Sequence, residues 1–332
     1  MNKGLTPLGP GVPKGPKATT IEKIMSVGIH TVEYLATMTP GALAMRTGMG
    51  KDTAENAIRK ALDYTGRGYV TAKQLHEELL KRTRLHTGSI ALDTLIGGGV
   101  ESESTLEIIG ENGAGKTQVC HSLAVHAQLP LEEGGLDGDV AWVDTEDTFR
   151  PDRIAQIAGS LGLDIDAVLS RIVRWKAKTS LDQVRAVEEL SGLCHERNIK
   201  LVIVDSMIAH LRGEYLGRGT LAERQQLLAD ALKKLENISQ VYKLTSVYTN
   251  QVVSTPDIYK PLKAAGGNIM GHAATMRIFL KKSNATKSVV VTLTKSPYLA
   301  DSQAVFVVDE YGISDTKKFL KERKKAEEET EE

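Results

Sequence analysis

One stretch of the chain carries glycines, a lysine and a threonine at a spacing that suits phosphate binding. It reads G-x-x-x-x-G-K-T and consists of Gly110, Glu111, Asn112, Gly113, Ala114, Gly115, Lys116 and Thr117. The glycines let backbone N–H groups curl around an anion at the start of a helix. The lysine can reach the β- and γ-phosphates, and the threonine hydroxyl can bind Mg²⁺. The motif predicts a site for a nucleoside triphosphate with Mg²⁺.

Acidic and amide side chains follow three other apolar stretches. Asp205 ends the run 200–205, and after a phosphate-binding loop a carboxylate in this position typically holds Mg²⁺ through water. Glu146 follows the run 140–144 and is our candidate for orienting and polarising the attacking water. The alternative is that Glu146 caps the next helix. Gln251 follows the run 244–249, where its amide can sense the γ-phosphate.

These residues need a sheet that brings strand ends together. The sequence predicts strands at 104–109, 139–144, 200–205, 244–249, 275–281, 287–293 and 303–308. It predicts helices at about 116–128, 151–161, 180–197 and 220–241, the last opened by a Thr220–Glu223 capping box. Alternating strands and helices are typical of an α/β fold with a mostly parallel sheet covered on both faces.

The N-terminal part of the chain has a different pattern. Residues 1–18 are rich in proline and glycine and predict a disordered leader, and Thr19 with Glu22 predicts a capping box. Two short helices flank Gly48-Met49-Gly50 and resemble a helix-hairpin-helix module. In such modules the backbone of the turn, here Gly48 and Gly50, holds a DNA phosphate. The alternative is a small helical bundle that serves only packing.

The stretch after this bundle is a linker. Tyr69 lies in a short β-prone segment, with Ala72 three positions later. Such a segment can add a strand to the sheet edge of a neighbouring protein. The alternative is an ordinary interdomain linker whose tyrosine packs on its own domain.

Composition excludes several classes of function. Lys+Arg and Asp+Glu both number 42, so any contact with nucleic acid must come from local patches. The two cysteines, Cys120 and Cys194, lie in apolar helical stretches and predict buried thiols. The sequence offers neither a signal peptide nor an apolar run of the roughly 20 residues that span a bilayer. We therefore expect a cytoplasmic protein without a membrane partner.

An ordered set of motifs resembles the archaeal RadA recombinases of the RecA superfamily. The resemblance runs from about residue 20 to 312. After the G-K-T-Q that ends at Gln118, its motifs are D-T-E-D-T-F-R-P at 144–151, V-D-S at 204–206, E-Y-L-G-R-G at 214–219, A-E-R-Q at 222–225, T-N-Q at 249–251 and G-G-N at 266–268.

The resemblance implies a RecA-like ATPase that forms helical filaments, or rings, with ATP bound between neighbouring copies. Glu146 would be the hydrolytic base, and Gln251 would couple the γ-phosphate to a DNA loop. Gln118, Arg153 and Lys295 would join the nucleotide site, with Arg153 against the adenine. DNA would lie on two loops that carry Arg212, Arg218, Arg224, Lys260, Lys263, Gly266 and Gly267. For the arginines, the alternative is a solvated helix start.

The resemblance also implies contacts between copies. Tyr69 and Ala72 match the F-x-x-A motif through which one copy docks on the next, with tyrosine in place of phenylalanine. Trp175 falls in the receiving pocket, where the family has a small residue. His272 would sense the nucleotide across the interface. Lys295 replaces the usual aspartate before Ser-Pro, so we expect little potassium dependence; the alternative is a surface lysine that points to solvent. Asp147 stands where glycine is usual.

We therefore predict a leader (1–18), a helix-hairpin-helix domain (19–65), a linker (66–84), a RecA-like core (85–316) and a charged tail (317–332). The predicted function is a DNA-dependent ATPase that pairs homologous single- and double-stranded DNA and exchanges strands in repair, at the nucleoid. One alternative is a mediator that binds ATP and a partner recombinase without long filaments of its own. Another is a hexameric RecA-fold motor. Mediators could also be partners of the recombinase itself.

Overall fold

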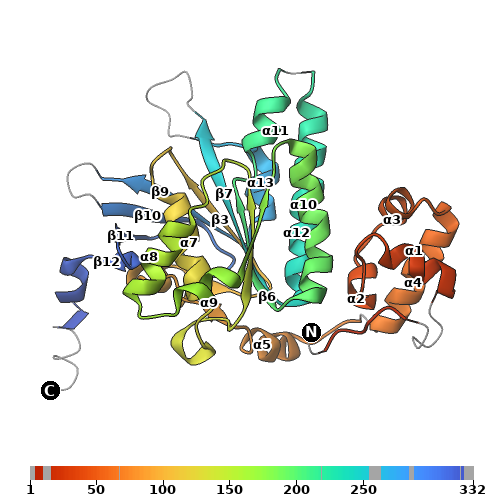
Figure 1. Ribbon diagram of the computed structural model, residues 1–332, viewed down its shortest axis with the longest axis horizontal. Coiled ribbons are helices and arrows are strands. Elements are labelled where there is room, and N and C mark those ends of the chain that lie inside the picture. Colours follow the sequence, from red (N-terminus) through yellow and green to blue (C-terminus); the bar gives the residue numbers. More distant parts are fainter. Residues whose placement is uncertain are drawn as a thin grey trace.

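A ten-stranded sheet forms the centre of the computed structural model, which describes residues 4–9, 16–66, 68–217, 219–253, 263–283, 288–321 and 323–324 (Figure 1). The strand order is β12-β11-β10-β9-β3-β7-β6-β4-β5, with β8 paired to β7. The strands are β3 (Thr105–Gly110), β4 (Asp139–Asp144), β5 (Ile172–Lys176), β6 (Ile199–Asp205), β7 (Thr245–Val253), β8 (Lys263–Ala264), β9 (Met276–Lys282), β10 (Ser288–Lys295), β11 (Gln303–Asp309) and β12 (Gly312–Asp315). A separate small sheet joins β1 (Arg84–Leu85) to β2 (Val100–Glu101).

The part of the sheet from β9 to β5 is parallel, and the part from β9 to β12 is antiparallel. Each predicted strand lies on an observed one, and the predicted mostly parallel α/β fold is confirmed. The central strands are rich in apolar residues and largely buried, since helices cover both faces of the sheet. β3, for example, is buried at every position.

Helices lie on both sides of the sheet. They are α6 (Ile90–Leu95), α7 (Lys116–His126), α8 (Pro151–Ser160), α9 (Ile165–Ser170), α10 (Ser180–Glu196), α11 (Ala209–Glu214), α12 (Leu221–Tyr242) and α13 (Gly267–Ala273), with a 3₁₀ turn at Leu131–Glu133. In Figure 1, α7 and α8 lie on one side and α10 and α12 on the other. Side chains of β4 alternate between the two cores: Val140 and Trp142 pack with α7, and Ala141 and Val143 pack with α10.

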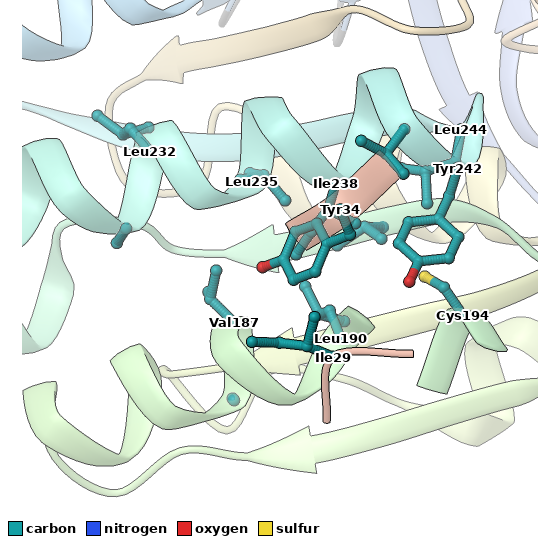
Figure 2. Close-up of a cluster of buried hydrophobic side chains, with 14 of the residues drawn as sticks. Ile29, Tyr34, Val187, Leu190, Cys194, Leu232, Leu235, Ile238, Tyr242 and Leu244 are labelled. Carbon is teal, nitrogen blue, oxygen red and sulfur yellow. The ribbon is translucent and has the colours of Figure 1, made fainter. Parts of the chain in front are cut away.

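The first helices form a bundle of α1 (Ala18–Met25), α2 (Val32–Leu35), α3 (Pro40–Thr47) and α4 (Lys51–Thr65). This bundle shares one hydrophobic cluster with α10 and α12. Figure 2 shows Ile29 and Tyr34 of the bundle packed among Leu190 of α10 and Ile238 of α12. All four side chains are at most 3% exposed, so the bundle is held to the α/β part by apolar burial.

Part of the predicted leader is ordered against the bundle. Pro7 pairs with Thr31 as an isolated β-bridge, and the Leu8 N–H donates to the His30 carbonyl at 2.8 Å. The Leu8 side chain is buried at 4% exposure. The prediction of a disordered leader did not include this contact, which depends on one apolar side chain among prolines and glycines.

Two predicted caps are wrong. α1 starts one residue before Thr19, with Lys17 as its N-cap and no side-chain cap, so Thr19 already lies in the first turn. Thr220 is the N-cap of α12, but its backbone is not extended (ψ 2°) and its side chain does not cap. The edge strands β5 and β12 were also missed. Both are short, and polar residues interrupt their apolar pattern.

Candidate nucleotide and DNA site

The glycine-rich loop links β3 to α7, as its sequence predicts. Gly113 and Gly115 adopt positive φ angles of 75° and 103°, which residues with a side chain rarely adopt. Gly110 is needed for a different reason. A Cβ atom there would lie 2.8 Å from the Leu280 carbonyl oxygen of β9. α7 begins directly at Lys116, so its first N–H groups face the loop.

Lys116 and Thr117 bring the loop together with the end of β6. The Lys116 ammonium donates to the carbonyls of Gly110 and Glu111, both at 2.9 Å. Thr117 Oγ1 donates to Asp205 Oδ2 at 2.7 Å, and Thr249 Oγ1 of β7 donates to Asp205 Oδ1 at 2.5 Å. Burial raises the pKa of Asp205 and lowers that of Lys116. A partly desolvated cation and carboxylate therefore face the same loop.

Glu146 lies just beyond the end of β4, where it contacts Gln251. Gln251 Nε2 donates to Glu146 Oε1 at 2.8 Å, although the two residues are 105 positions apart. The alternative that Glu146 caps the next helix is excluded, because α8 has Arg150 as N-cap without a side-chain cap. The parallel pairing of β3 with β7 also places Gln251 beside Gly110, at the start of the glycine-rich loop.

Gln251 also touches the segment that leads back from the second predicted DNA loop. The Ala265 N–H donates to the Gln251 carbonyl at 2.8 Å. The neighbouring Asn250 donates from its side chain to the Ala265 carbonyl at 2.9 Å and to Glu107 at 2.7 Å. The end of β7 therefore contacts both Glu146 and the base of this loop.

Arg153 and Gln118 lie together at the edge of this site. Arg153 Nε donates to Gln118 Oε1 at 2.9 Å, and its Nη2 donates to the carbonyls of Asp309 and Gly312. The guanidinium therefore connects α7, α8 and the turn between β11 and β12.

Lys295 does not point to solvent. Its ammonium donates to the carbonyls of Gly271, His272 and Ala274 at 3.0, 3.0 and 2.6 Å. These carbonyls belong to the last turn and end of α13, where the helix dipole favours a cation. Lys295 and the predicted sensor His272 are thereby connected within one chain.

Some of the predicted DNA-binding residues lie outside the described residues, namely Arg218 and Lys260. Arg212 is exposed on α11, and Arg224 is half-buried in the first turn of α12. α11 and the end of β7 lie at the same end of the molecule (Figure 1). Lys263 is exposed on β8.

Gly266 is the N-cap of α13, and Gly267 is its first residue. Gly266 and Gly267 have positive φ angles of 77° and 58°. A Cβ on Gly266 would meet the Met270 sulfur at 2.6 Å, so glycine is required for both conformation and space.

The N-terminal turn forms as expected between α3 and α4. Gly48 is left-handed (φ 67°) and ends α3, and Gly50 is the N-cap of α4 without a side-chain cap. Neither glycine has a heavy atom within 4 Å of a Cβ built on it, except Thr53 at 4.0 Å from that of Gly50. The turn is therefore open to a ligand.

The linker leaves its aromatic side chain without cover. Tyr69 is fully exposed. Ala72 is the first residue of α5 (Ala72–Leu79), whose N-terminus carries a capping box formed by Thr71 and Gln74. None of the residues of α5 is buried. Elsewhere, a groove of about 800 Å³ lies between the edge strand β5, α10 and the bundle. Trp175 lines it, and its Nε1 donates to Asp182 at 3.2 Å.

Sequence reasoning missed one buried histidine of the site. His121 lies one turn after Thr117, with its Nδ1 2.8 Å from the Thr117 carbonyl, and its Nε2 accepts from the Arg150 N–H at 3.1 Å. Its ring packs against Trp142 and Phe149, with centroids 5.0 and 5.8 Å away. Burial lowers its pKa to about 4. The signal available was a histidine four residues after the threonine of a phosphate-binding loop.

Comparison with known proteins decides between the families that share such a loop. The sequence profile of the Rad51 family matches residues 78–316. The chain belongs to the Rad51 family. It is also similar to the "DNA repair and recombination protein RadA" of Aeropyrum pernix, with 41% identity over 315 residues that cover 94% of this chain and 97% of that protein. The protein of the same name from Ignicoccus hospitalis is 41% identical over 313 residues, which cover 92% of this chain and 94% of that one.

The predicted resemblance to the RadA recombinases is thereby confirmed. The profile of the Rad51 family covers the α/β part and the end of the linker, and the RadA relatives also cover most of the N-terminal bundle. In the part of the chain that the structure describes, no helix is long and apolar enough to cross a membrane.

Proposed function

We propose that this Rad51-family protein is a DNA-dependent ATPase that assembles on single-stranded DNA and exchanges strands with homologous duplex DNA in repair. One observation carries the proposal: the end of β7 contacts both the predicted catalytic glutamate and the segment at the base of the second predicted DNA loop. Gln251 donates to Glu146 and accepts from Ala265 at the base of the second DNA loop. A change at the γ-phosphate can therefore reach the DNA loop through one residue.

ATP would bind residues 110–118 between copies, with Arg153 and Lys295 at the edges of the site. Among the described residues, no cluster of three His, Cys, Asp or Glu side chains suits a metal ion. A hydroxyl and a carboxylate are oxygen donors that Mg²⁺ accepts together with phosphate and water. Thr117 and Asp205, 2.7 Å apart, fit this donor set. Bound Mg²⁺ would neutralise charge that develops on the phosphates.

Hydrolysis requires a water in line with the γ-phosphate. In our proposal, Glu146 orients this water and accepts its proton, and Gln251 holds the carboxylate in place. Lys116 faces the phosphates and compensates their charge. Phosphoryl transfer is mainly a matter of position and charge, so one placed carboxylate is sufficient as a base.

DNA would bind two loops and the N-terminal module. Arg212, Arg218 and Arg224 on the first loop would contact phosphates, as would Lys260 and Lys263 on the second. The backbone at Gly266 and Gly267 would lie near the single strand. The turn that contains Gly48 and Gly50 would hold a phosphate, in keeping with its open position.

Assembly would use the linker. The exposed Tyr69, followed by Ala72, would add to the free edge of β5 in the next copy, with its ring in the groove beside Trp175. His272 would face the nucleotide of the neighbour. The product is a helical filament, or a ring in the absence of DNA.

The domain divisions at residues 18, 65, 84 and 316 remain part of this proposal. So do contacts with mediator proteins and a location at the nucleoid in the cytoplasm, where the substrate DNA lies.

ATP hydrolysis measured with and without single-stranded DNA, with electron microscopy of the same samples, tests the proposal. We expect DNA to stimulate hydrolysis and helical filaments to form on it. ATP binding without stimulation or filaments would instead indicate a mediator, a reading that the bulky Trp175 in the groove favours. Closed rings on DNA, without helical filaments, would indicate a RecA-fold motor.

A further inference from the structure

The short loop that carries Glu146 is organised by one buried carboxylate. Asp144 ends β4 and its side chain is 0% exposed. Its Oδ1 accepts from the backbone N–H groups of Glu146 and Thr148 at 3.3 and 3.2 Å, and its Oδ2 accepts from that of Phe149 at 3.2 Å. The conformation of the Glu146 backbone therefore depends on where this carboxylate lies.

Arg174 of the neighbouring strand β5 fixes this carboxylate. Its Nε and Nη2 donate to Asp144 Oδ2 at 2.9 and 2.6 Å. Its guanidinium also lies over the Phe149 ring, 5.9 Å from the centroid. A buried carboxylate needs a countercharge, and Arg174 is the cation within ion-pair distance of Asp144 among the described residues.

Asp147 fixes Arg174 from the other side of Glu146. Its Oδ1 accepts from Arg174 Nη2 at 2.5 Å, and its Oδ2 accepts from Lys176 Nζ at 2.6 Å. Asp147 has a left-handed backbone (φ 57°), a conformation in which aspartate is tolerated better than most residues. Hydrogen bonds from Lys176 and Arg174 lower the pKa of Asp147, which favours the ionised carboxylate that accepts these bonds.

We propose that Arg174 and Asp147 are positioning residues for Glu146. The guanidinium bridges the residues two before and one after the catalytic glutamate, and thereby holds the glutamate at the distance from Gln251 that hydrolysis requires. The inference rests on the proposed role of Glu146 as the base. It assigns no contact with ATP to Arg174, so loss of Arg174 should affect turnover and leave nucleotide binding unchanged.

A structural role alone is the competing explanation, because β5 lies at the edge of the sheet and Arg174 also joins it to β4. Arg171 offers a matched control. It donates to Asp139 at 3.0 Å at the opposite end of the same strand pair, away from Glu146. Arg171 is the residue just before β5, so Arg171→Met removes ion pairs with Asp137 and Asp139 beside the same two strands without touching the Glu146 loop.

The first test does not depend on activity. Hydrogen exchange of the full chain is measured at the amides of Glu146, Thr148 and Phe149, which donate to Asp144. In Arg174→Met we expect exchange at these amides to be faster by about tenfold or more, and in Arg171→Met to be unchanged. Equal protection of these amides in Arg174→Met and in the wild type would overturn the proposal.

The second test separates kcat from KM in ATP hydrolysis. Displacement of a catalytic group by about 1 Å can lower the rate on the order of a hundredfold. We therefore expect kcat of Arg174→Met to fall at least tenfold while KM for ATP stays within about twofold. Arg174→Lys should recover part of kcat, and Asp147→Asn should show a smaller loss. Equal losses in Arg171→Met, or a parallel change in KM and thermal stability, would show that the role is only structural.

The two tests also separate this inference from the proposed function. If the wild type does not hydrolyse ATP, the proposed function fails, and the exchange experiment still decides whether Arg174 orders the loop. If the wild type hydrolyses ATP and Arg174→Met does so equally well, the inference alone fails.

Discussion

Gln251 Nε2 lies 2.8 Å from Glu146 Oε1, and this hydrogen bond joins two strands on either side of β6. The contact connects the proposed base to the strand that leads into the second proposed DNA loop. Because the carbonyl of Gln251 also accepts from Ala265, movement of Gln251 would change both neighbours together. With the roles proposed above, this relationship provides a short path between the nucleotide site and the DNA loop.

Replacement of the proposed base should separate assembly from hydrolysis. In Glu146→Gln the amide keeps the shape of the side chain but cannot accept a proton from water. We expect kcat to fall by about a hundredfold or more, with ATP binding and DNA filaments retained. Turnover assays and electron microscopy of one preparation measure both properties. Retention of wild-type turnover would show that another group is the base.

Lys295 should make hydrolysis insensitive to potassium. Its ammonium already bonds three carbonyls at the end of α13, so a bound cation is not needed there. At constant ionic strength we expect the rate to change by less than about twofold across a potassium titration. Lys295→Ala should introduce a potassium requirement, whereas Lys282→Ala, at an exposed position of β9, should not. A strong requirement in the wild type contradicts this prediction.

Acid should destabilise the protein through His121. Its folded-state pKa of about 4 lies below the ordinary value of 6.5, so between these values the unfolded chain binds the proton more readily. The contribution to stability is complete above pH 6.5 and is lost as the pH falls toward 4, by up to about 3 kcal/mol. Thermal melting across this range measures the loss.

The matched variant for this prediction is His121→Gln, which does not titrate. Its melting temperature should fall less steeply with acid than that of the wild type. The melting temperature of the variant will still depend on pH, because burial also lowers the pKa of His30 and His126. If the melting temperatures of the wild type and the variant fell equally with acid, His121 would not contribute to the acid sensitivity.

The attachment of the N-terminal bundle should depend on Ile29. Its side chain is fully buried between α10 and α12 (Figure 2), and truncation of such a residue costs about 2 to 5 kcal/mol. We expect Ile29→Ala to melt earlier and to be cut faster by protease in the linker. Met45→Ala, at a position that is 85% exposed, serves as control. Equal digestion of the two variants would mean that Ile29 does not hold the bundle in place.

Much of the fold could be predicted because its signals are local. The glycine-rich loop, the apolar strands that end in Asp144 and Asp205, and the helices between them all show in short windows of sequence. Their meeting at one sheet edge follows from parallel pairing, so the closeness of Thr117 and Asp205 was predictable.

The missed features depend on contacts between distant segments. β5 has a partly polar sequence and becomes a strand because β4 pairs with it, so the proposed role of Arg174 could not be predicted from its neighbours in sequence. The packing of Ile29 and Tyr34 on α10 and α12 likewise joins segments more than 150 residues apart. His121 was overlooked because its partner, the Arg150 N–H, lies on another element.

Strand exchange between single-stranded DNA and a labelled homologous duplex, in the presence of ATP and Mg²⁺, tests the central claim most directly. We predict transfer of the labelled strand with homologous DNA, none with heterologous DNA, and none with Lys116→Ala. Absence of transfer by wild-type protein that binds ATP and single-stranded DNA would contradict the assignment as a recombinase.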